Sequence, residues 1–164
     1  MISFEYLNKP EFEKYSQPIF DILADNMTVI APTGNSRAKD FELWSEAVSG
    51  SLERAERQII LIKDNEVLIG FFQYNVNENI FLMEEIQFKP EYHGKGIFRE
   101  LYSFVFSNLK DGLVYVEAYA SVNNKKSIGI LEKLGLSNVG LNKNGRSYHF
   151  KGSFNDLIKW FERE

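Results

Sequence analysis

The sequence predicts a single α/β domain in which a mixed, mostly antiparallel sheet is flanked by helices. Three β-rich runs, at residues 58–62, 67–76 and 80–88, are separated by the turn sequences KDNE and NEN and predict an antiparallel meander. An amphipathic helical pattern over residues 97–109 then leads to another apolar run, LVYVEAYA. A strand, a helix and a strand in this order predict a right-handed crossover and one parallel pair.

Helical patterns precede this sheet along the chain. ISFEYL at residues 2–7 predicts a first strand, and Pro10 suits the first turn of a following helix. Apolar residues then recur at helical spacing, but Pro18 predicts that the segment is divided into two short helices. Residues 31–40, APTGNSRAKD, have the composition of a loop, and a helical pattern resumes at Phe41.

The C-terminal part predicts a helix, a hairpin and a second helix. NNKKSIGILEKLGL is helical, with an Asn to cap its start and Gly135 to end it in a left-handed conformation. Asn144-Gly145 favours a primed hairpin turn between two strands. Apolar residues at helical spacing from Phe154 to Phe161 predict a final amphipathic helix.

Composition argues against several classes of function. A formal charge of -4 and a pI of about 5.3 provide no basic field for a nucleic-acid backbone. The absence of cysteine and the wide separation of the 2 histidines argue against disulfides and a metal site. The start is too charged for a signal peptide, and no apolar run approaches the roughly 18 residues of a membrane span. We therefore expect a cytoplasmic protein with no nucleic-acid or membrane partner.

The segment EYHGKGIFRE lies between a predicted strand and a predicted helix. A helix that begins near Gly96 leaves its first backbone N–H groups without intrahelical partners, and its dipole adds partial positive charge there. Gly94 and Gly96 let a ligand approach the backbone, and Lys95 and Arg99 add positive charge, so the segment suits a phosphate. Alone it is equally consistent with an ordinary loop, because it matches neither the P-loop pattern nor the dinucleotide fingerprint.

The order of meander, glycine-containing loop, helix, strand, helix and hairpin resembles the GNAT superfamily of N-acetyltransferases, from about Ile59 to Phe150. In that family a Gln/Arg-x-x-Gly-x-Gly/Ala motif binds the pyrophosphate of acetyl-coenzyme A (acetyl-CoA). The motif falls here on His93, Gly94, Lys95, Gly96, Ile97 and Phe98. His93 replaces Gln or Arg and can still donate a hydrogen bond. Phe98 replaces a small residue, and it either crowds the cofactor or turns into the core.

The resemblance implies two further parts of a cofactor site. The pantetheine arm would lie against the backbone of Ile86, Gln87 and Phe88, at the end of the strand before the glycine loop. A second family motif, which begins Asn-x-x-Ala/Ser, places Asn124 and Ser127 at the start of the following helix.

Residue 131 departs from the second motif. Leu131 stands where many members carry a tyrosine thought to protonate the departing thiolate, which puts that general acid in doubt. Conceivable substitutes are a bound water or one of four tyrosines: Tyr92, Tyr115, Tyr119 and Tyr148.

Acetyl transfer to an amine needs a group that accepts the amine's proton. Glu84 and Glu85 point to opposite faces of the predicted strand, so only one faces the transfer point. Position relative to Phe88 favours Glu85 as the base, with Glu84 in reserve and Glu117 on the neighbouring strand as a third candidate. His149 is more typical of a structural residue than of a base.

The resemblance implies an acetyl-CoA-dependent N-acetyltransferase that moves the acetyl group to a primary amine, on a small molecule or a peptide, by direct attack. The alternatives are a catalytically silent acyl-CoA sensor, which Leu131 motivates, and an interaction domain with an incidental glycine loop. The sequence leaves open whether the protein forms a homodimer.

The expected division of the chain is a helical part at 1–57 that lines the acceptor site, a cofactor-binding core at 58–152 and a helix at 153–164. Acidic residues in the N-terminal helices suit a cationic amine: Asp25, Asp40, Glu42 and Glu46.

Overall fold

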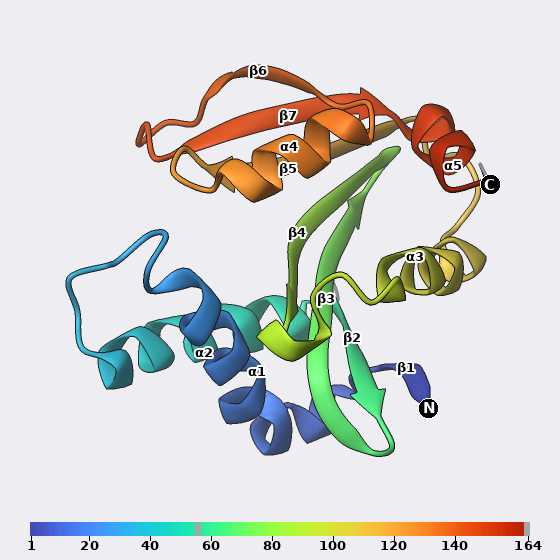
Figure 1. The fold of residues 1–164 in the computed structure, drawn as a ribbon. Helices are drawn as coiled ribbons and strands as arrows, with labels where there is room; N and C mark the ends of the chain where they lie inside the picture. Colours follow the sequence, from blue (N-terminus) through green and yellow to red (C-terminus); the bar gives the residue numbers. More distant parts are fainter. Residues whose placement is uncertain (55–56, 163–164) are drawn as a thin grey trace. The chain divides into compact units, whose positions relative to one another are not determined.

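The computed structural model describes residues 1–54 and 57–162 (Figure 1). Residues 55–56 of the expected N-terminal part and residues 163–164 of the expected final helix lie outside the described residues. The strands are β1 (Ile2–Tyr6), β2 (Arg57–Asp64), β3 (Val67–Asn77), β4 (Ile80–Phe88), β5 (Tyr115–Ser121), β6 (Ser137–Leu141) and β7 (Ser147–Ser153). The α-helices are α1 (Phe12–Met27), α2 (Arg37–Glu53), α3 (Ile97–Asn108), α4 (Lys125–Lys133) and α5 (Phe154–Glu162), and two short 3-10 helices are η1 (Lys9–Glu11) and η2 (Pro90–Tyr92).

The predicted α/β fold class is confirmed. The strands form one mixed sheet in the order β1-β2-β3-β4-β5-β7-β6. Its parallel step joins β4 to β5, where Ile80 pairs with Tyr115 and Met83 with Ala118, and α3 is the crossover helix between them. The predicted turn between β2 and β3 has positive φ angles at Asn65 and Glu66, as a primed hairpin turn requires.

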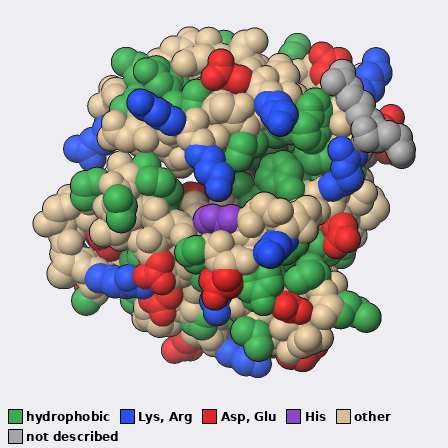
Figure 2. Space-filling model, viewed as in Figure 1, with side chains coloured by type: hydrophobic (Ala, Val, Ile, Leu, Met, Phe, Trp, Pro, Cys, Tyr) green, Lys and Arg blue, Asp and Glu red, His purple; other side chains and the backbone are tan. Residues whose placement is uncertain are grey.

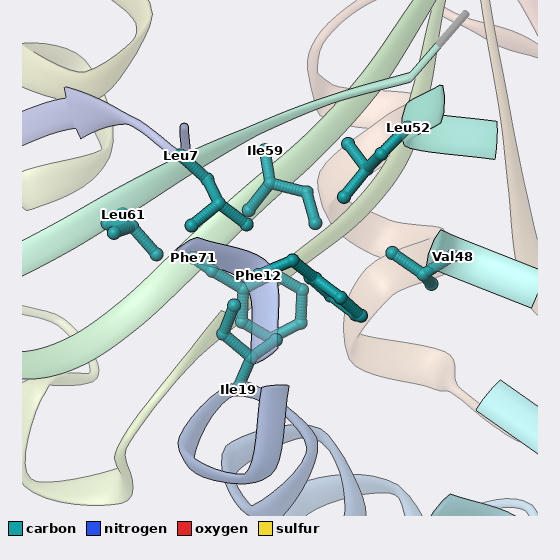
Figure 3. Close-up of a cluster of buried hydrophobic side chains, with 8 residues drawn as sticks. All are labelled: Leu7, Phe12, Ile19, Val48, Leu52, Ile59, Leu61 and Phe71. Carbon is teal, nitrogen blue, oxygen red and sulfur yellow. The ribbon is translucent and has the colours of Figure 1, made fainter. Parts of the chain in front are cut away.

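The chain divides into two compact units, one of residues 1–74 and 85–95 and one of residues 75–84 and 96–164. In the first unit α1 and α2 contact each other (Figure 1) and pack on β2 and β3. Figure 3 shows a cluster of buried hydrophobic side chains in this unit, formed by Leu7, Phe12, Ile19, Val48, Leu52, Ile59, Leu61 and Phe71. Burial of this apolar surface holds the two helices against the sheet.

The second unit has an aromatic core between α3 and α5. Tyr102 is fully buried and stacks on Phe161, with ring centroids 4.3 Å apart and an interplanar angle of 11°. The Tyr102 hydroxyl donates a hydrogen bond to the Met83 sulfur at 3.0 Å. The predicted amphipathic helices at residues 97–109 and 154–161 therefore bury their apolar faces against each other.

Helix α1 continues through Pro18, so the prediction of two short helices is wrong. Proline lacks the N–H that would donate to the carbonyl of residue 14. Both Lys14 and Pro18 are exposed, so water can satisfy that carbonyl. Burial of Phe12, Ile19 and Phe20 on the opposite side holds the helix together across the proline.

Helix α2 begins at Arg37, four residues before the predicted start at Phe41. The Ser36 side chain caps it by accepting a hydrogen bond from the Lys39 backbone N–H at 3.1 Å. The capping residue lay inside the segment that composition assigned to a loop.

The connection between β6 and β7 is also different from the predicted primed turn. It spans residues 142–146, with a hydrogen bond from the Gly145 N–H to the Asn142 carbonyl at 3.0 Å. Gly145 has a φ of 70°, whereas Asn144 is not among the residues with positive φ. A longer turn that ends in a left-handed glycine therefore replaces the primed turn, although the hairpin itself is confirmed.

Surface charge is mixed on the face drawn in Figure 2, where Lys and Arg side chains are interspersed with Asp and Glu side chains. None of the described helices has the length and apolarity that a membrane span requires.

Candidate functional site

The glycine loop has the local geometry that its sequence predicts. Gly94 and Gly96 have φ angles of 73° and 75°, in the left-handed region that disfavours other residues. A Cβ atom built on either glycine would meet nothing within 4 Å, so the space beside the backbone is open. Gly96 is the N-cap of α3 and supplies no side-chain acceptor for the first N–H groups of the helix.

The residues around these glycines differ in how they can contribute. The Nε2–H of His93 donates to the Phe88 carbonyl at 3.0 Å, so the ring is directed to the end of β4. Lys95 is exposed. Phe98 turns into the aromatic core, with its ring centroid 4.8 Å from that of Tyr102, which resolves the question of whether it crowds the loop.

Arg99 is engaged by α5. Its Nη1 donates to the Phe161 carbonyl, and its guanidinium lies 5.9 Å from the ring centroid of Trp160. Ile97, the first residue of α3, is buried and anchors the helix start. The positive charge of Arg99 therefore sits in the first turn of α3 while one of its donors holds the C-terminal helix.

The end of β4 is fixed by a chain of hydrogen bonds from α1. Asn26 Nδ2 donates to the Gln87 side-chain oxygen at 2.9 Å and to the Phe88 carbonyl at 2.8 Å. Gln87 Nε2 in turn donates to Glu85 Oε1 at 2.6 Å. Glu85, Ile86, Gln87 and Phe88 are all partly buried. The Glu85 carboxylate is thus held in place by an amide that α1 itself orients.

Close packing against β3 also fixes this strand end. A Cβ on Gly70 would lie 2.6 Å from the Gln87 carbonyl oxygen and 2.8 Å from Phe88 Cδ1. No side chain larger than hydrogen fits there without a shift of β4. Gly70 therefore permits the close approach of β3 to Gln87 and Phe88.

A cavity of about 800 Å³ lies in the first unit, and sequence reasoning did not predict it. Its apolar wall includes Phe20 and Met27 of α1 and Leu43 and Trp44 of α2, and residues 31–35 between the helices close part of it. Glu85 is the β4 residue in the lining. The favoured base thus borders a cavity large enough for a small organic molecule.

Charged side chains in the lining are held by specific partners. The two oxygens of Asp40 accept from Thr33 Oγ1 at 2.7 Å and from Asn35 Nδ2 at 3.2 Å. Arg37 donates to Asp25 at 2.9 Å and to Asp21 at 3.0 Å, and these hydrogen bonds raise the pKa of its guanidinium. The hydrogen bonds of Asp40 and Arg37 therefore fix the C-terminal end of the loop at residues 28–36.

Comparison with protein-family models gives a match over residues 16–136 to the acetyltransferase (GNAT) family. The chain belongs to the GNAT acetyltransferase family. A search of curated proteins found no match. Acetyl-CoA is the acyl donor that is the norm in the family.

Solved structures of other GNAT proteins share the fold. PaiA N-acetyltransferase from Thermoplasma acidophilum, in complex with coenzyme A, matches with a TM-score of 0.73 at 16% identity, over 94% of this chain and 99% of that chain. An acetyltransferase from Thermus thermophilus matches with a TM-score of 0.73 at 11% identity, over 94% and 97%. Spermidine N-acetyltransferase from Vibrio cholerae, in complex with CoA and spermine, matches with a TM-score of 0.62 at 19% identity, over 96% and 98%.

The second GNAT motif forms the start of α4. Asn124 Oδ1 accepts from the Ser127 backbone N–H at 3.2 Å, which caps the helix as predicted. Leu131, at the family's tyrosine position, is 9% exposed and belongs to the hydrophobic core. In this GNAT protein α4 thus carries an apolar side chain where a proton donor was expected.

The four alternative tyrosines of this GNAT protein lie in different surroundings. The Tyr92 hydroxyl donates to Asp64 at 2.8 Å, which raises the pKa of Tyr92 and lowers that of Asp64. Tyr115 and Tyr119 are exposed, and Tyr148 is partly buried. The cavity lining contains none of the four.

The third carboxylate candidate, Glu117, is paired with a histidine. His149 Nε2 lies 2.6 Å from Glu117 Oε1, and the His149 ring stacks on Tyr119 with centroids 4.4 Å apart. These three residues lie on one face of β5 and β7, where Tyr119 pairs with His149 across the ladder. Glu84, the reserve candidate, is partly buried and belongs to the second unit, whereas Glu85 belongs to the first.

Proposed function

We propose that this GNAT protein is an N-acetyltransferase that acetylates a primary amine by direct attack. The observation that carries the proposal is the glycine loop at the start of α3, with both glycines left-handed and open on their Cβ side, within a chain of the GNAT family. The acceptor is an amine on a small molecule or a peptide.

The residues of the loop fit the pyrophosphate of acetyl-CoA. The N–H groups of Gly96, Ile97 and Phe98 stand at the positive end of the α3 dipole, and Lys95 adds an exposed cation. His93, Gly94 and Arg99 complete the set around the loop. These groups together supply the donors and the charge that two phosphates require.

The remaining contacts follow the family pattern. The backbone of Ile86, Gln87 and Phe88 would hold the pantetheine arm, and Asn124 and Ser127 would border the cofactor at the start of α4. When bound, acetyl-CoA supplies the acetyl group as a thioester, so that the C–N bond of the product replaces the C–S bond and coenzyme A leaves as its thiol.

Glu85 is the general base of the proposal. It borders the cavity, and Gln87 donates to one of its oxygens. In this position the carboxylate accepts the proton that the ammonium group must lose, directly or through water, before the nitrogen can attack. Glu84 is the alternative base if Glu85 proves dispensable.

Leu131 removes the tyrosine of α4 as a proton donor, so the proposal assigns protonation of the leaving thiolate to water. The same proposal includes a cytoplasmic location and leaves the choice between monomer and homodimer open. It also divides the chain into three parts, at residues 1–57, 58–152 and 153–164.

Calorimetric titration with acetyl-CoA tests the first half of the proposal, with adenosine as the control that lacks the pyrophosphate. Micromolar binding, about −8 kcal/mol, that adenosine does not reproduce is the expected result. The absence of binding would contradict both the enzyme and a silent acyl-CoA sensor.

Release of coenzyme A with an amine tests the second half. Because the chain has no cysteine, a thiol reagent reports only the released cofactor. Thiol release that depends on an amine supports the enzyme. Tight acetyl-CoA binding with no release across a broad amine panel would favour the sensor instead.

A further inference from the structure

The cavity beside Glu85 presents a large apolar wall. Phe20 is 4% exposed, and its ring centroid lies 5.6 Å from that of Trp44 and 5.4 Å from that of Phe41. Leu43 and Met27 add flexible aliphatic surface to the same lining. Such a wall gains free energy mainly from the apolar groups of a ligand, because an uncharged polar group placed against it would lose its hydration.

The carboxylates of the lining set the charge of the occupant. Asp40 accepts hydrogen bonds from two uncharged groups, Thr33 and Asn35, and it lies in the first turn of α2. Arg37, the cation of the lining, is bound by Asp21 and Asp25. The cavity therefore attracts a cation and repels an anion.

The balance between these features separates classes of amine. A ligand with several ammonium groups would bring a further charge against Leu43 and Met27, whose side chains offer no hydrogen bond to replace its hydration. A small hydrophilic amine would leave a volume of about 800 Å³ mostly unfilled. An ammonium group on an alkyl or arylalkyl body satisfies both the acidic and the apolar parts.

We propose that this cavity selects an amphipathic primary monoamine, with its ammonium group at Glu85, its alkyl or aryl body against Phe20, Leu43 and Trp44, and Asp40 adding electrostatic attraction. The inference rests on the proposed function, because it names the acceptor class of the proposed acetyl transfer. It departs from the polyamine that accompanies the Vibrio cholerae structure.

Fluorescence of Trp44 can follow binding directly. The chain has 2 tryptophans, and Trp160 lies on α5, so Trp160→Phe leaves Trp44 as the single reporter. The full chain is titrated with unbranched alkylamines from butylamine to octylamine, with 2-phenylethylamine and with spermidine. Affinity is expected to rise about fourfold per added methylene until the cavity is filled. Spermidine is expected to bind more weakly than octylamine or 2-phenylethylamine.

Two variants test separately how the charge of the lining and its apolar wall contribute to amine affinity. Asp40→Asn should weaken every alkylamine by roughly three- to tenfold and keep the dependence on chain length. The matched control Glu53→Gln removes an exposed acid from the same helix outside the lining and should leave affinity unchanged. Leu43→Asn should flatten the chain-length dependence, and its 48% exposure makes the substitution compatible with folding.

The outcomes keep this inference distinct from the proposed function. Affinity that is independent of chain length, or spermidine that binds and is acetylated in preference to alkylamines, would overturn the monoamine class and leave an N-acetyltransferase standing. Alkylamines that bind with the expected dependence but release no coenzyme A would support the cavity's ligand class and contradict the enzyme.

Discussion

The glycine loop and the cavity, the proposed sites for the cofactor and the acceptor, are built in opposite ways. The loop uses backbone groups of one continuous segment, with Gly94 and Gly96 keeping side chains out of the way. The cavity uses side chains from α1, α2 and the segment between them, together with Glu85 of β4, which comes from a distant part of the sequence. A backbone site tolerates changes of side chain around it, whereas a side-chain site changes its ligand with each substitution. A backbone site suits an acetyl donor that the whole family shares, and a side-chain site suits an acceptor that is particular to one protein.

Removal of the carboxylate at the cavity should have the largest effect. Glu85→Gln is expected to lower kcat by about 10²–10⁴-fold, because loss of a general base commonly costs that much. The pH dependence that the carboxylate contributes should disappear from the rate profile, while calorimetric affinity for acetyl-CoA is retained. Glu84→Gln is the matched control. A rate profile unaltered by Glu85→Gln and altered by Glu84→Gln would exchange the roles of the two acids.

A carboxylate placed in the loop should act on the other region. Gly96→Glu combines a left-handed φ of 75° with negative charge at the helix N-terminus, and roughly a hundredfold loss of acetyl-CoA affinity is expected. Gly112→Glu is the control, because Gly112 also has a positive φ, of 90°, and open space. Equal losses in the two variants would mean that backbone strain, and not the loop's position, causes the effect.

Disruption of the hydrogen-bond chain from α1 should have an intermediate effect. Gln87→Met removes the donor that lies 2.6 Å from Glu85 and keeps the backbone of β4. A fall of about tenfold in kcat, a shifted pH profile of kcat and an unchanged KM for acetyl-CoA are expected. Gln17→Met removes a comparable bond to Asp21, 2.9 Å long and exposed, and should not change kcat. A rise in KM for acetyl-CoA with constant kcat would instead place the Gln87 side chain at the cofactor.

Loss of the cap of α2 should have the smallest effect. Ser36→Ala removes the acceptor of the Lys39 N–H and should lower the free energy of unfolding by about 1 kcal/mol, as measured by urea denaturation. Ser45→Ala, within the same helix, removes a bond to the Glu42 carbonyl and should be nearly neutral. If Ser36→Ala also weakens alkylamines, the start of α2 contributes to the shape of the cavity as well as to stability.

The contrast between the regions also explains what the sequence could predict. The order of strands and helices, the cap at Asn124 and the left-handed stop at Gly135 follow from local chemistry, and all are present. The continuous α1 could not be predicted, because burial on the far side of the helix outweighs the local preference of Pro18.

In the candidate site, too, the sequence predicts what depends on local chemistry and does not predict what depends on tertiary packing. The spacing of Gly94 and Gly96 predicts the loop, since a backbone site depends on a short stretch of chain. The cavity depends on Phe20, Trp44 and Glu85, which the fold alone brings together. A run of aromatic residues at helical spacing gives no sign of whether the rings fill a core or line a space.

The hydrogen bond from Arg99 to the Phe161 carbonyl joins residues separated by 62 positions in the chain. Closing a loop of this length costs conformational entropy, so the contact depends on the tertiary structure around it and is sensitive to local opening. Any fluctuation that detaches α5 would expose the aromatic side of α3 and release the arginine in its first turn. Acetyl-CoA bound at that turn would therefore slow hydrogen exchange in α5 as well as in α3.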